Sequence, residues 1–403
     1  MTKHLTTALL LILLITPCLT AAQKPKASTI RQELDQARSI IKSGKDFDKA
    51  ERLMVDLLKD ANNKDNKKIY LTWFEAVRAQ YTAANERLYL KAKQDTAEFF
   101  NYTQRMFTIL EALDSVDMRP NKKGRVDIEY RQKHAEILDA YRPNLFNAGT
   151  YHLRKGDYQQ AYAYFEKYID CDRQPLFTGR NYTANDNRMP EAAYWATFSA
   201  YKMMDAVLTL RHRELALRDS SKASFTLQYI AEARRWMKDQ ELYVETLEEG
   251  FHRFPTFSYF FPRLMDAYTS EGQLEKALSL ADKAIEACDT CELYYFAKAT
   301  TLLRLGRYGE CIKVSEQIIS INPNLAEAYF NAGTSYINIA LKLNERKDKK
   351  QIRQLYQKAR PYMERYRQLM PDEKEKWGPA LYRIYLNLNM GKQFDEIDRL
   401  LTR

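Results

Sequence analysis

The residues of this chain with the clearest chemical spacing are Cys288 and Cys291, which are separated by two residues. Such a pair can be a redox motif, half of a zinc site or a local disulfide. A redox motif usually lies between a strand and a helix, and no strand pattern precedes this pair. A zinc site requires a second ligand pair, and no such pair of cysteines or histidines lies nearby. We therefore expect a local structural disulfide, with two free thiols as the alternative, and no metal site.

Other signatures of catalysis are missing from the sequence. It contains no glycine-rich phosphate loop, no HExxH motif and no nucleophile elbow. The chain has five histidines, and His212 and His252 show no metal-ligand spacing. Its many carboxylates lie in charged stretches that are typical of solvated helical faces. We therefore expect a protein that is not an enzyme, with no catalytic residue and no cofactor.

The start of the chain, Met1 to Ala22, has the pattern of a secretory signal peptide. An apolar run from Ala8 to Ile15 ends before Pro17 and the small residues up to Ala22. This run is shorter than the roughly 20 residues that a bilayer-spanning helix needs. Cys18 offers lipidation as the alternative, although the residues before it match a lipobox poorly. We expect export to the periplasm or cell envelope of a gram-negative bacterium, where envelope association would not use a transmembrane helix.

Composition favours long helices and argues against a nucleic-acid partner. Charged residues make up 29% of the 403 residues and apolar residues 45%, whereas glycine and proline number 12 each. Few helix breakers among many charged and apolar residues are typical of amphipathic helices. The formal net charge of +10 is spread along the chain among 53 acidic residues, as on a solvated surface. We therefore expect an all-α chain that binds no nucleic acid.

A repeat organises the chain around Ser258–Asn324. Gly272 is matched by Gly306 and Ala277 by Cys311, at the same separation along the chain. A turn glycine, a small residue and a terminal proline at a period of about 34 residues resemble the tetratricopeptide repeat. The resemblance implies a right-handed α-solenoid of helical hairpins, and together with the signal-like start it predicts an exported bacterial protein of this family. It also implies that Ala277 and Cys311 are small buried residues where two helices cross closely.

The spacing of turns extends this register through the middle of the chain. One turn is expected per period, at Met204, Lys238, Gly272 and Gly306. Gly156, however, precedes Met204 by clearly more than one period, which places an insertion near 174–189. Insertions in such folds often project from one face, and this one is either a functional loop or a plain insertion. A second excess over the period, near 341–354, should lengthen both helices of its hairpin.

These patterns predict how the chain is divided. Long helical patterns over Ile69–Leu113 are expected to form two helices that meet near Gln94 and Asp95. The expected segments are a signal peptide over 1–22, N-terminal helical repeats over 23–117, a loop and linking helix over 118–141, and the solenoid over 142–403 with its two insertions.

In the family that the chain resembles, the first helix of each repeat forms the inner wall of the solenoid. The family register assigns aromatic residues to this wall with cations beside them, a combination that dominates binding hot spots. The alternative is that these aromatic residues pack against neighbouring helices. The partner-binding residues implied by the resemblance are Tyr194, Phe198, Tyr201, Lys202, Arg235, Trp236, Phe296, Arg304, Phe330 and Asn338.

The resemblance implies recognition of a protein or peptide partner. With the signal-like start and the missing catalytic motifs, we expect an exported, non-enzymatic scaffold. The alternative is a glycan-binding surface protein, because the starch-utilisation binding lipoproteins embed similar repeats. This chain differs from those lipoproteins in lacking a good lipobox and the large irregular region that carries their sugar site. The identity of the partner and the oligomeric state do not follow from the sequence.

Overall fold

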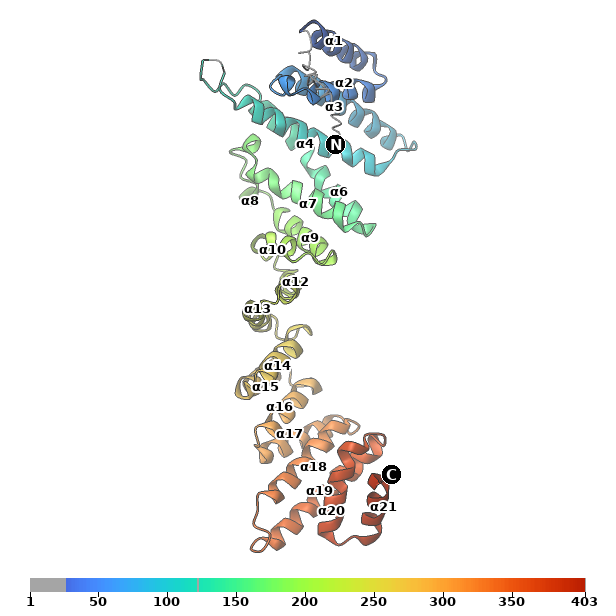
Figure 1. Cartoon of the computed structure of the whole chain (residues 1–403), viewed down its shortest axis with the longest axis vertical. Helices are drawn as coiled ribbons and strands as arrows, with labels where there is room; N and C mark the ends of the chain where they lie inside the picture. Colours follow the sequence, from blue (N-terminus) through green and yellow to red (C-terminus); the bar gives the residue numbers. More distant parts are fainter. Residues whose placement is uncertain (1–26, 122, 403) are drawn as a thin grey trace, which may run out of the picture. The chain divides into compact units, whose positions relative to one another are not determined.

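The computed structural model describes residues 27–121 and 123–402, and every regular element in these ranges is helical (Figure 1). They form two units. Unit 1 holds the described residues up to Lys155 together with Ala163–Asp186, and unit 2 holds Gly156–Tyr162 and the described residues from Asn187 onward. The expected signal peptide and Cys18 lie outside the described residues. None of the helices in the described part of the chain is both long enough and apolar enough to cross a bilayer.

Capping residues explain where the long helices of unit 1 begin. Asn66 accepts a hydrogen bond from the Lys68 N–H at 3.2 Å, and Asp95 accepts one from the Ala97 N–H at 2.9 Å. The two longest helices therefore meet close to Asp95, as predicted. The helices of unit 1 are α1 (Ala27–Ser43), α2 (Phe47–Lys59), α3 (Lys67–Tyr89), α4 (Thr96–Asp117), α5 (Arg131–Asp139), α6 (Arg142–Arg154), most of α7 (Tyr158–Asp170) and the short α8 (Tyr182–Asn185).

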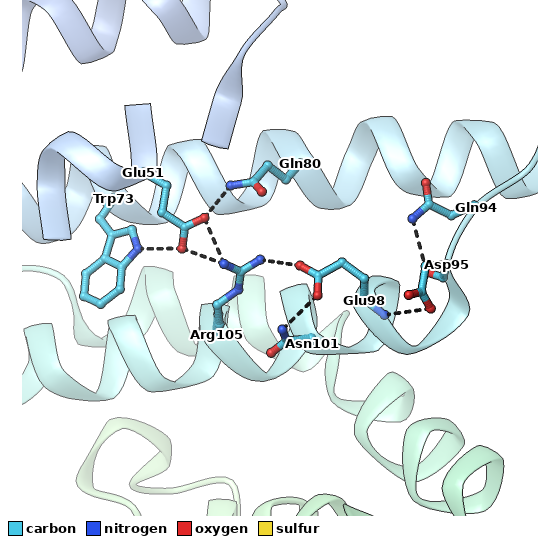
Figure 2. Close-up of polar contacts among 8 residues, drawn as sticks. All are labelled: Glu51, Trp73, Gln80, Gln94, Asp95, Glu98, Asn101 and Arg105. Atoms are coloured by element: carbon cyan, nitrogen blue, oxygen red, sulfur yellow. Dashed lines mark hydrogen bonds and ion pairs between the residues drawn. The ribbon is translucent and has the colours of Figure 1, made fainter. Parts of the chain in front are cut away.

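A network of polar side chains centred on Glu51 holds α2 against α3 and α4 (Figure 2). Glu51 is 7% exposed and accepts hydrogen bonds from Trp73 Nε1 at 3.1 Å and Gln80 Nε2 at 2.6 Å. Arg105 donates to both Glu51 oxygens, at 2.9 and 3.0 Å, and to Glu98 at 2.9 Å. Since four hydrogen bonds already engage the Glu51 carboxylate, we assign the network a structural role rather than a catalytic one.

The first insertion packs into unit 1 instead of projecting from it. Phe177 is 2% exposed, and its ring lies 6.0 Å from the ring of Phe107 on α4. Leu176 is also buried. Burying a large apolar side chain stabilises the fold by roughly 1.5–3 kcal/mol. Although residues 174–186 are mostly polar, their apolar side chains therefore hold this segment against unit 1.

Arg142 fastens the far end of the same insertion. Its guanidinium lies 3.7 Å from the ring centroid of Tyr168 and 3.9 Å from that of Tyr182. Its Nη1 also pairs with the Asp186 carboxylate at 2.5 Å. A planar guanidinium can contact aromatic faces while its N–H groups bind a carboxylate, so one buried arginine joins α6, α7 and the insertion.

Unit 2 is a series of helical hairpins. First helices of neighbouring hairpins contact one another, as α9 contacts α12 and α16 contacts α18. The helices are the start of α7, α9 (Met189–Lys202), α10 (Ala206–Arg211), α11 (Arg213–Ala216), α12 (Ala223–Trp236), α13 (Gln240–Arg253), α14 (Phe260–Ser270), α15 (Leu274–Ala287), α16 (Glu292–Arg304), α17 (Tyr308–Ile321), α18 (Ala326–Leu341), α19 (Lys349–Leu369), α20 (Lys374–Leu388) and α21 (Gly391–Thr402).

The turns predicted from the repeat spacing all have left-handed backbone. The φ angle is 57° at Met204, 59° at Lys238, and 73° at both Gly272 and Gly306. Glycine adopts this conformation freely, whereas another residue type is destabilised by roughly 1–2 kcal/mol there. Met204 and Lys238 therefore show that packing of the repeats, rather than local preference, sets the turn.

Small residues let the helices approach where they cross. Ala277 and Cys311 are fully buried, as predicted. Gly250 on α13 faces the Phe260 ring on α14, and a Cβ atom at this position would overlap that ring. The predicted all-α fold of helical hairpins packed side by side is confirmed.

The second insertion lengthens both helices of its hairpin, as predicted. Helix α18 has 16 residues where α16 has 13, and α19 has 21 residues where α17 has 14. Helix α19 buries Tyr356 and Tyr366 in the C-terminal core cluster of unit 2.

Candidate binding surface

Helices α9 and α12 carry an interleaved stack of three aromatic rings. Tyr201 on α9 stacks on Tyr229 with ring centroids 4.5 Å apart and an interplanar angle of 25°. It also stacks on Trp236, at 5.6 Å and 15°. Tyr229 and Trp236 are seven residues apart on α12, which is about 10.5 Å along a helix axis and leaves room for one ring. Tyr201 therefore lies between two turns of α12, with both ring faces covered.

Phe198 and Tyr194 extend this stack toward the start of α9. Phe198 lies 5.7 Å from Tyr229 and 6.1 Å from Tyr158. Tyr194 is 6% exposed and packs edge-on against Trp195 at 4.8 Å. Burial raises the pKa of Tyr229, and a hydrogen bond with Tyr194 raises it further, so the phenol of Tyr229 is neutral at physiological pH. Four of the aromatic residues assigned from the register, Tyr194, Phe198, Tyr201 and Trp236, thus lie in one cluster of rings on α9 and α12.

Two lysines lie over the outer rings of the stack. Lys202 Nζ is 5.4 Å from the ring centroid of Phe198, and Lys222 Nζ is 5.4 Å from that of Tyr194. Lys222 also pairs with Asp219 at 3.0 Å, whereas Lys202 is exposed. A cation–π contact at an exposed site stabilises the pair by about 0.5–1 kcal/mol. The Phe198 ring therefore positions the ammonium group of Lys202, whose N–H groups can still donate hydrogen bonds to a partner.

A charged cluster around Glu232 lies one turn before Trp236 on α12. Glu232 is 6% exposed; Arg235 donates to one of its oxygens at 2.5 and 2.9 Å, and the Tyr259 hydroxyl donates to the other at 2.8 Å. Arg263 on α14 lies 3.8 Å from the Glu232 carboxylate and 3.8 Å from the Tyr259 ring centroid. The side chains of Arg235 and Arg263 are 56% and 40% exposed. One buried carboxylate therefore orients two exposed guanidinium groups.

These two groups of side chains together form what we call the aromatic–arginine surface. It consists of Tyr194, Phe198, Tyr201, Lys202, Lys222, Tyr229, Glu232, Arg235, Trp236, Tyr259 and Arg263. The hydrogen bond to Glu232 raises the pKa of Arg235, so the Arg235 guanidinium remains charged. The surface therefore combines apolar rings with fixed positive charge, which can hold an anionic group beside an apolar one.

The remaining residues assigned from the sequence lie on α16 and α18. Arg304 is exposed and donates to the Thr269 carbonyl oxygen at 3.2 Å. Phe296 and Phe330 are partly buried and pack against two hydrophobic clusters. Asn338 is partly buried on α18. Arg304 can therefore contact a partner, whereas the two phenylalanines contribute mainly to packing.

Some residues of the surface were not among the ten partner-binding residues assigned from the sequence, namely Lys222, Tyr229, Glu232, Tyr259 and Arg263. Tyr259 occupies the place in its repeat that Phe225 occupies one period earlier, so extending the register to this repeat would have identified it. Tyr229 and Arg263 lie outside the register. Their contribution depends on how α9, α12 and α14 pack, which has no signal in the sequence.

The disulfide expected from the cysteine spacing is not present. Cys288 and Cys291 are both free thiols. The Cys288 sulfur instead lies 3.6 Å from the Thr290 hydroxyl, within the turn. In the described residues, no group of three or more His, Cys, Asp or Glu side chains is placed to hold a metal ion.

Comparison with known proteins places two of these hairpins in a family. The tetratricopeptide repeat model matches residues 143–175 and 293–325, which correspond to the hairpins α6–α7 and α16–α17. No curated protein matches the chain.

Several solved structures align with the chain at low identity. The C-terminal part of a TPR repeat-containing protein from Cytophaga hutchinsonii has a TM-score of 0.42 and 15% identity, over 62% of this chain and 92% of that one. YrrB, a TPR protein with an unusual peptide-binding site, has a TM-score of 0.35 and 16% identity, over 47% and 90%. Yeast Tom70 has a TM-score of 0.33 and 11% identity, over 92% and 90%.

The assignment rests on the matched hairpins and on features that the structure shows around them. Left-handed turns recur once per period from Met204 to Gly306, and fully buried small residues recur at Ala277 and Cys311. Gly306 and Cys311 lie in the matched repeat over 293–325, and the other positions precede them by whole periods of about 34 residues. The hairpins at residues 143–175 and 293–325 are therefore tetratricopeptide repeats.

Proposed function

We propose that this protein is an exported, non-enzymatic scaffold that binds a protein or peptide partner through the aromatic–arginine surface. The observation that carries the proposal is the pair of exposed guanidinium groups, Arg235 and Arg263, held by buried Glu232. Orienting these side chains in advance reduces the conformational entropy that binding must overcome. Arginine and large aromatic residues are also the types that dominate protein interfaces.

The preferred partner is an extended segment that carries a carboxylate next to an apolar side chain. The carboxylate would bind Arg235 or Arg263, and the apolar side chain would lie against Trp236. Lys202, one helix away, offers a further donor for a second acidic residue. Export rests on the signal-like pattern of residues 1–22, and we retain the periplasm or cell envelope as the proposed location.

The glycan-binding alternative receives less support from this geometry. A sugar ring stacks on an open aromatic face, whereas Tyr201 has Tyr229 and Trp236 against its two faces. Phe198 likewise contacts Tyr229, and Lys202 lies over its ring. The faces of Tyr201 and Phe198 are therefore occupied by neighbouring side chains, which leaves less open ring surface on which a pyranose could stack.

The test is capture of partners from an envelope extract by the full-length mature chain. The double variant Trp236→Ala and Arg235→Ala should lose the captured protein while keeping its helical circular dichroism. A matched double variant, Leu242→Ala and Arg253→Ala, removes an exposed apolar residue and an arginine from α13 and should retain capture. Unchanged capture by the first variant, or binding to a glycan array but to no protein, would overturn the proposal.

A further inference from the structure

Cys288 and Cys291 occupy the two ends of the turn that joins α15 to α16. Cys288 follows the last residue of α15, Cys291 precedes the first residue of α16, and Asp289 and Thr290 form the turn between them. The ends of a β-turn lie within about 7 Å of each other. This is close to the Cα separation that a disulfide spans, about 4.4–6.8 Å. The turn therefore brings the two thiols close enough to be joined without unfolding either helix.

The two sulfurs are accessible and share a neighbour. Both side chains are partly exposed, and both pack at the edge of the hydrophobic cluster that contains Tyr294. The other two described cysteines, Cys171 and Cys311, are fully buried. Only the pair in the turn, among the described cysteines, can therefore meet a reagent from solution.

Donors in the turn surround the Cys288 sulfur. Its Sγ lies 3.6 Å from the Thr290 hydroxyl. The pKa of Cys288 is lowered by hydrogen bonding, first from this hydroxyl and then from the backbone N–H groups of Thr290 and Cys291. The charge of Asp289 acts in the opposite direction and is outweighed. By contrast, burial raises the pKa of Cys171 to about 12. The thiolate is the nucleophilic form of cysteine, so the turn favours reaction at Cys288.

We propose that Cys288 and Cys291 form a thiol–disulfide exchange site, in which Cys288 attacks an external disulfide and Cys291 resolves the product. The Cys288 thiolate forms a bond to one sulfur of the external disulfide, and the other sulfur leaves as a thiolate. The Cys291 thiolate then attacks the Cys288 sulfur, forms the internal disulfide and releases the second external thiolate. The two cysteines lose two electrons and two protons in total, and the external disulfide is reduced to two thiols.

This site goes beyond the proposed scaffold function and does not depend on it. The internal disulfide would link the second helix of one repeat to the first helix of the next. The substrate class is a small or protein disulfide with an accessible sulfur. The exchange site and the aromatic–arginine surface use different residues of unit 2, so each can fail without the other.

The test uses the reduced mature chain and oxidised glutathione, with products followed by mass spectrometry after acid quenching. Wild type should form the internal disulfide, with no stable glutathione adduct. Cys291→Ser should accumulate one glutathione on Cys288, because nothing resolves the mixed disulfide. Cys288→Ser should react several-fold more slowly, at Cys291. Thr290→Val should slow the attack of Cys288 on oxidised glutathione several-fold near neutral pH. When Thr290→Val is added to Cys288→Ser, the slow reaction of Cys291 should keep its rate.

Two results would overturn the proposal. One is a wild-type chain whose Cys288 and Cys291 stay reduced, or that keeps a stable glutathione adduct, after its reaction with oxidised glutathione has reached equilibrium. The other is equal rates for the two single-cysteine variants, which would mean that the turn does not select Cys288. Adducts at Cys171 or Cys311 would indicate unfolding, and such preparations are identified by their loss of helical circular dichroism.

Discussion

Tyr201 stacks on Trp236 with ring centroids 5.6 Å apart and planes inclined by 15°. This contact joins α9 of one hairpin to α12 of the next, and Tyr229 covers the other face of the same ring. The stack is therefore both part of the proposed binding surface and part of the packing between repeats. Substitutions in it must be judged by stability as well as by binding.

Replacing Tyr201 with leucine should lower the free energy of unfolding by about 1–3 kcal/mol. Each aromatic pair contributes about 0.5–1.5 kcal/mol beyond the area it buries, and leucine removes two such pairs. Tyr201→Phe keeps the ring and should stay within about 0.5 kcal/mol of wild type. Urea denaturation followed by circular dichroism measures both variants. Equal losses in the two would show that the hydroxyl, and not the stack, stabilises this contact.

Gly250→Ala should destabilise the protein by about 1–3 kcal/mol, as overpacking of a core usually does. An added Cβ would overlap the Phe260 ring, and this outweighs the roughly 1 kcal/mol by which alanine favours a helix over glycine. Gly309 on α17 is the control, because no atom lies within 4 Å of its added Cβ. Gly309→Ala should leave the thermal midpoint unchanged or raise it. A neutral Gly250→Ala would mean that Phe260 can move aside.

Glu51→Leu should destabilise unit 1 by about 3–5 kcal/mol, the usual effect of removing one partner of a buried ion pair. The substitution leaves the Arg105 guanidinium, the Trp73 indole N–H and the Gln80 amide without their acceptor. Adding Arg105→Met should recover much of the loss, since an apolar pair can replace a buried ionic one. Chemical denaturation measures both variants.

Glu98→Gln provides the control for this network. Glu98 also pairs with Arg105, but its side chain is 40% exposed. Glu98→Gln should therefore lower the free energy of unfolding by no more than about 1 kcal/mol, as for exposed ion pairs. If Glu51→Leu and Glu98→Gln were equally mild, the network in Figure 2 would not be what holds α2 against α4.

Asp117 should make the stability of unit 1 depend on pH in the acid range. Burial alone would raise the pKa of Asp117, but hydrogen bonds from Lys67 and from the N–H groups of Tyr130 and Glu129 outweigh it and lower the pKa below 3.8. A lowered carboxyl pKa stabilises the fold above the unfolded value, and this stabilisation is lost as the pH falls through the folded value.

Asp117→Asn should therefore cost about 1–3 kcal/mol at pH 7, the range for hydrogen bonds to charged groups. The difference from wild type should shrink as the pH falls below 3.8. Asp48→Asn makes the same change at an exposed pair with Arg52 and should stay within about 1 kcal/mol. Thermal melts between pH 2.5 and 7 measure both, and a difference that stays constant over this range would contradict the assignment.

The turn positions illustrate what local pattern can predict. Gly272 and Gly306 establish the repeat spacing, and counting back from them locates Met204 and Lys238, although neither residue favours a left-handed backbone. The count succeeds because each repeat must present its helices to the next at the same spacing. The first insertion is different: the sequence left open a functional loop or a plain insertion, and only the structure shows that Phe177 is buried against Phe107.

The candidate surface was predicted only in part, for a geometric reason. The register assigned Tyr201 and Trp236 to adjacent first helices, and the structure stacks their rings on each other. It did not show that Tyr194 is buried or that the rings cover one another's faces. Adjacent residues of a helix point about 100° apart, so a register error of one residue exchanges a buried side chain for an exposed one.

By itself, the sequence determined the helical class, the repeat period and the positions of the turns, because these depend on spacing along one chain. Only the tertiary structure decided that Glu232 holds Arg235 and Arg263 together, and that residues 174–186 pack inward. It also decided that Cys288 faces Thr290 rather than forming a disulfide. These relationships depend on distances between side chains from different turns and helices, which packing sets to within a fraction of a helical turn.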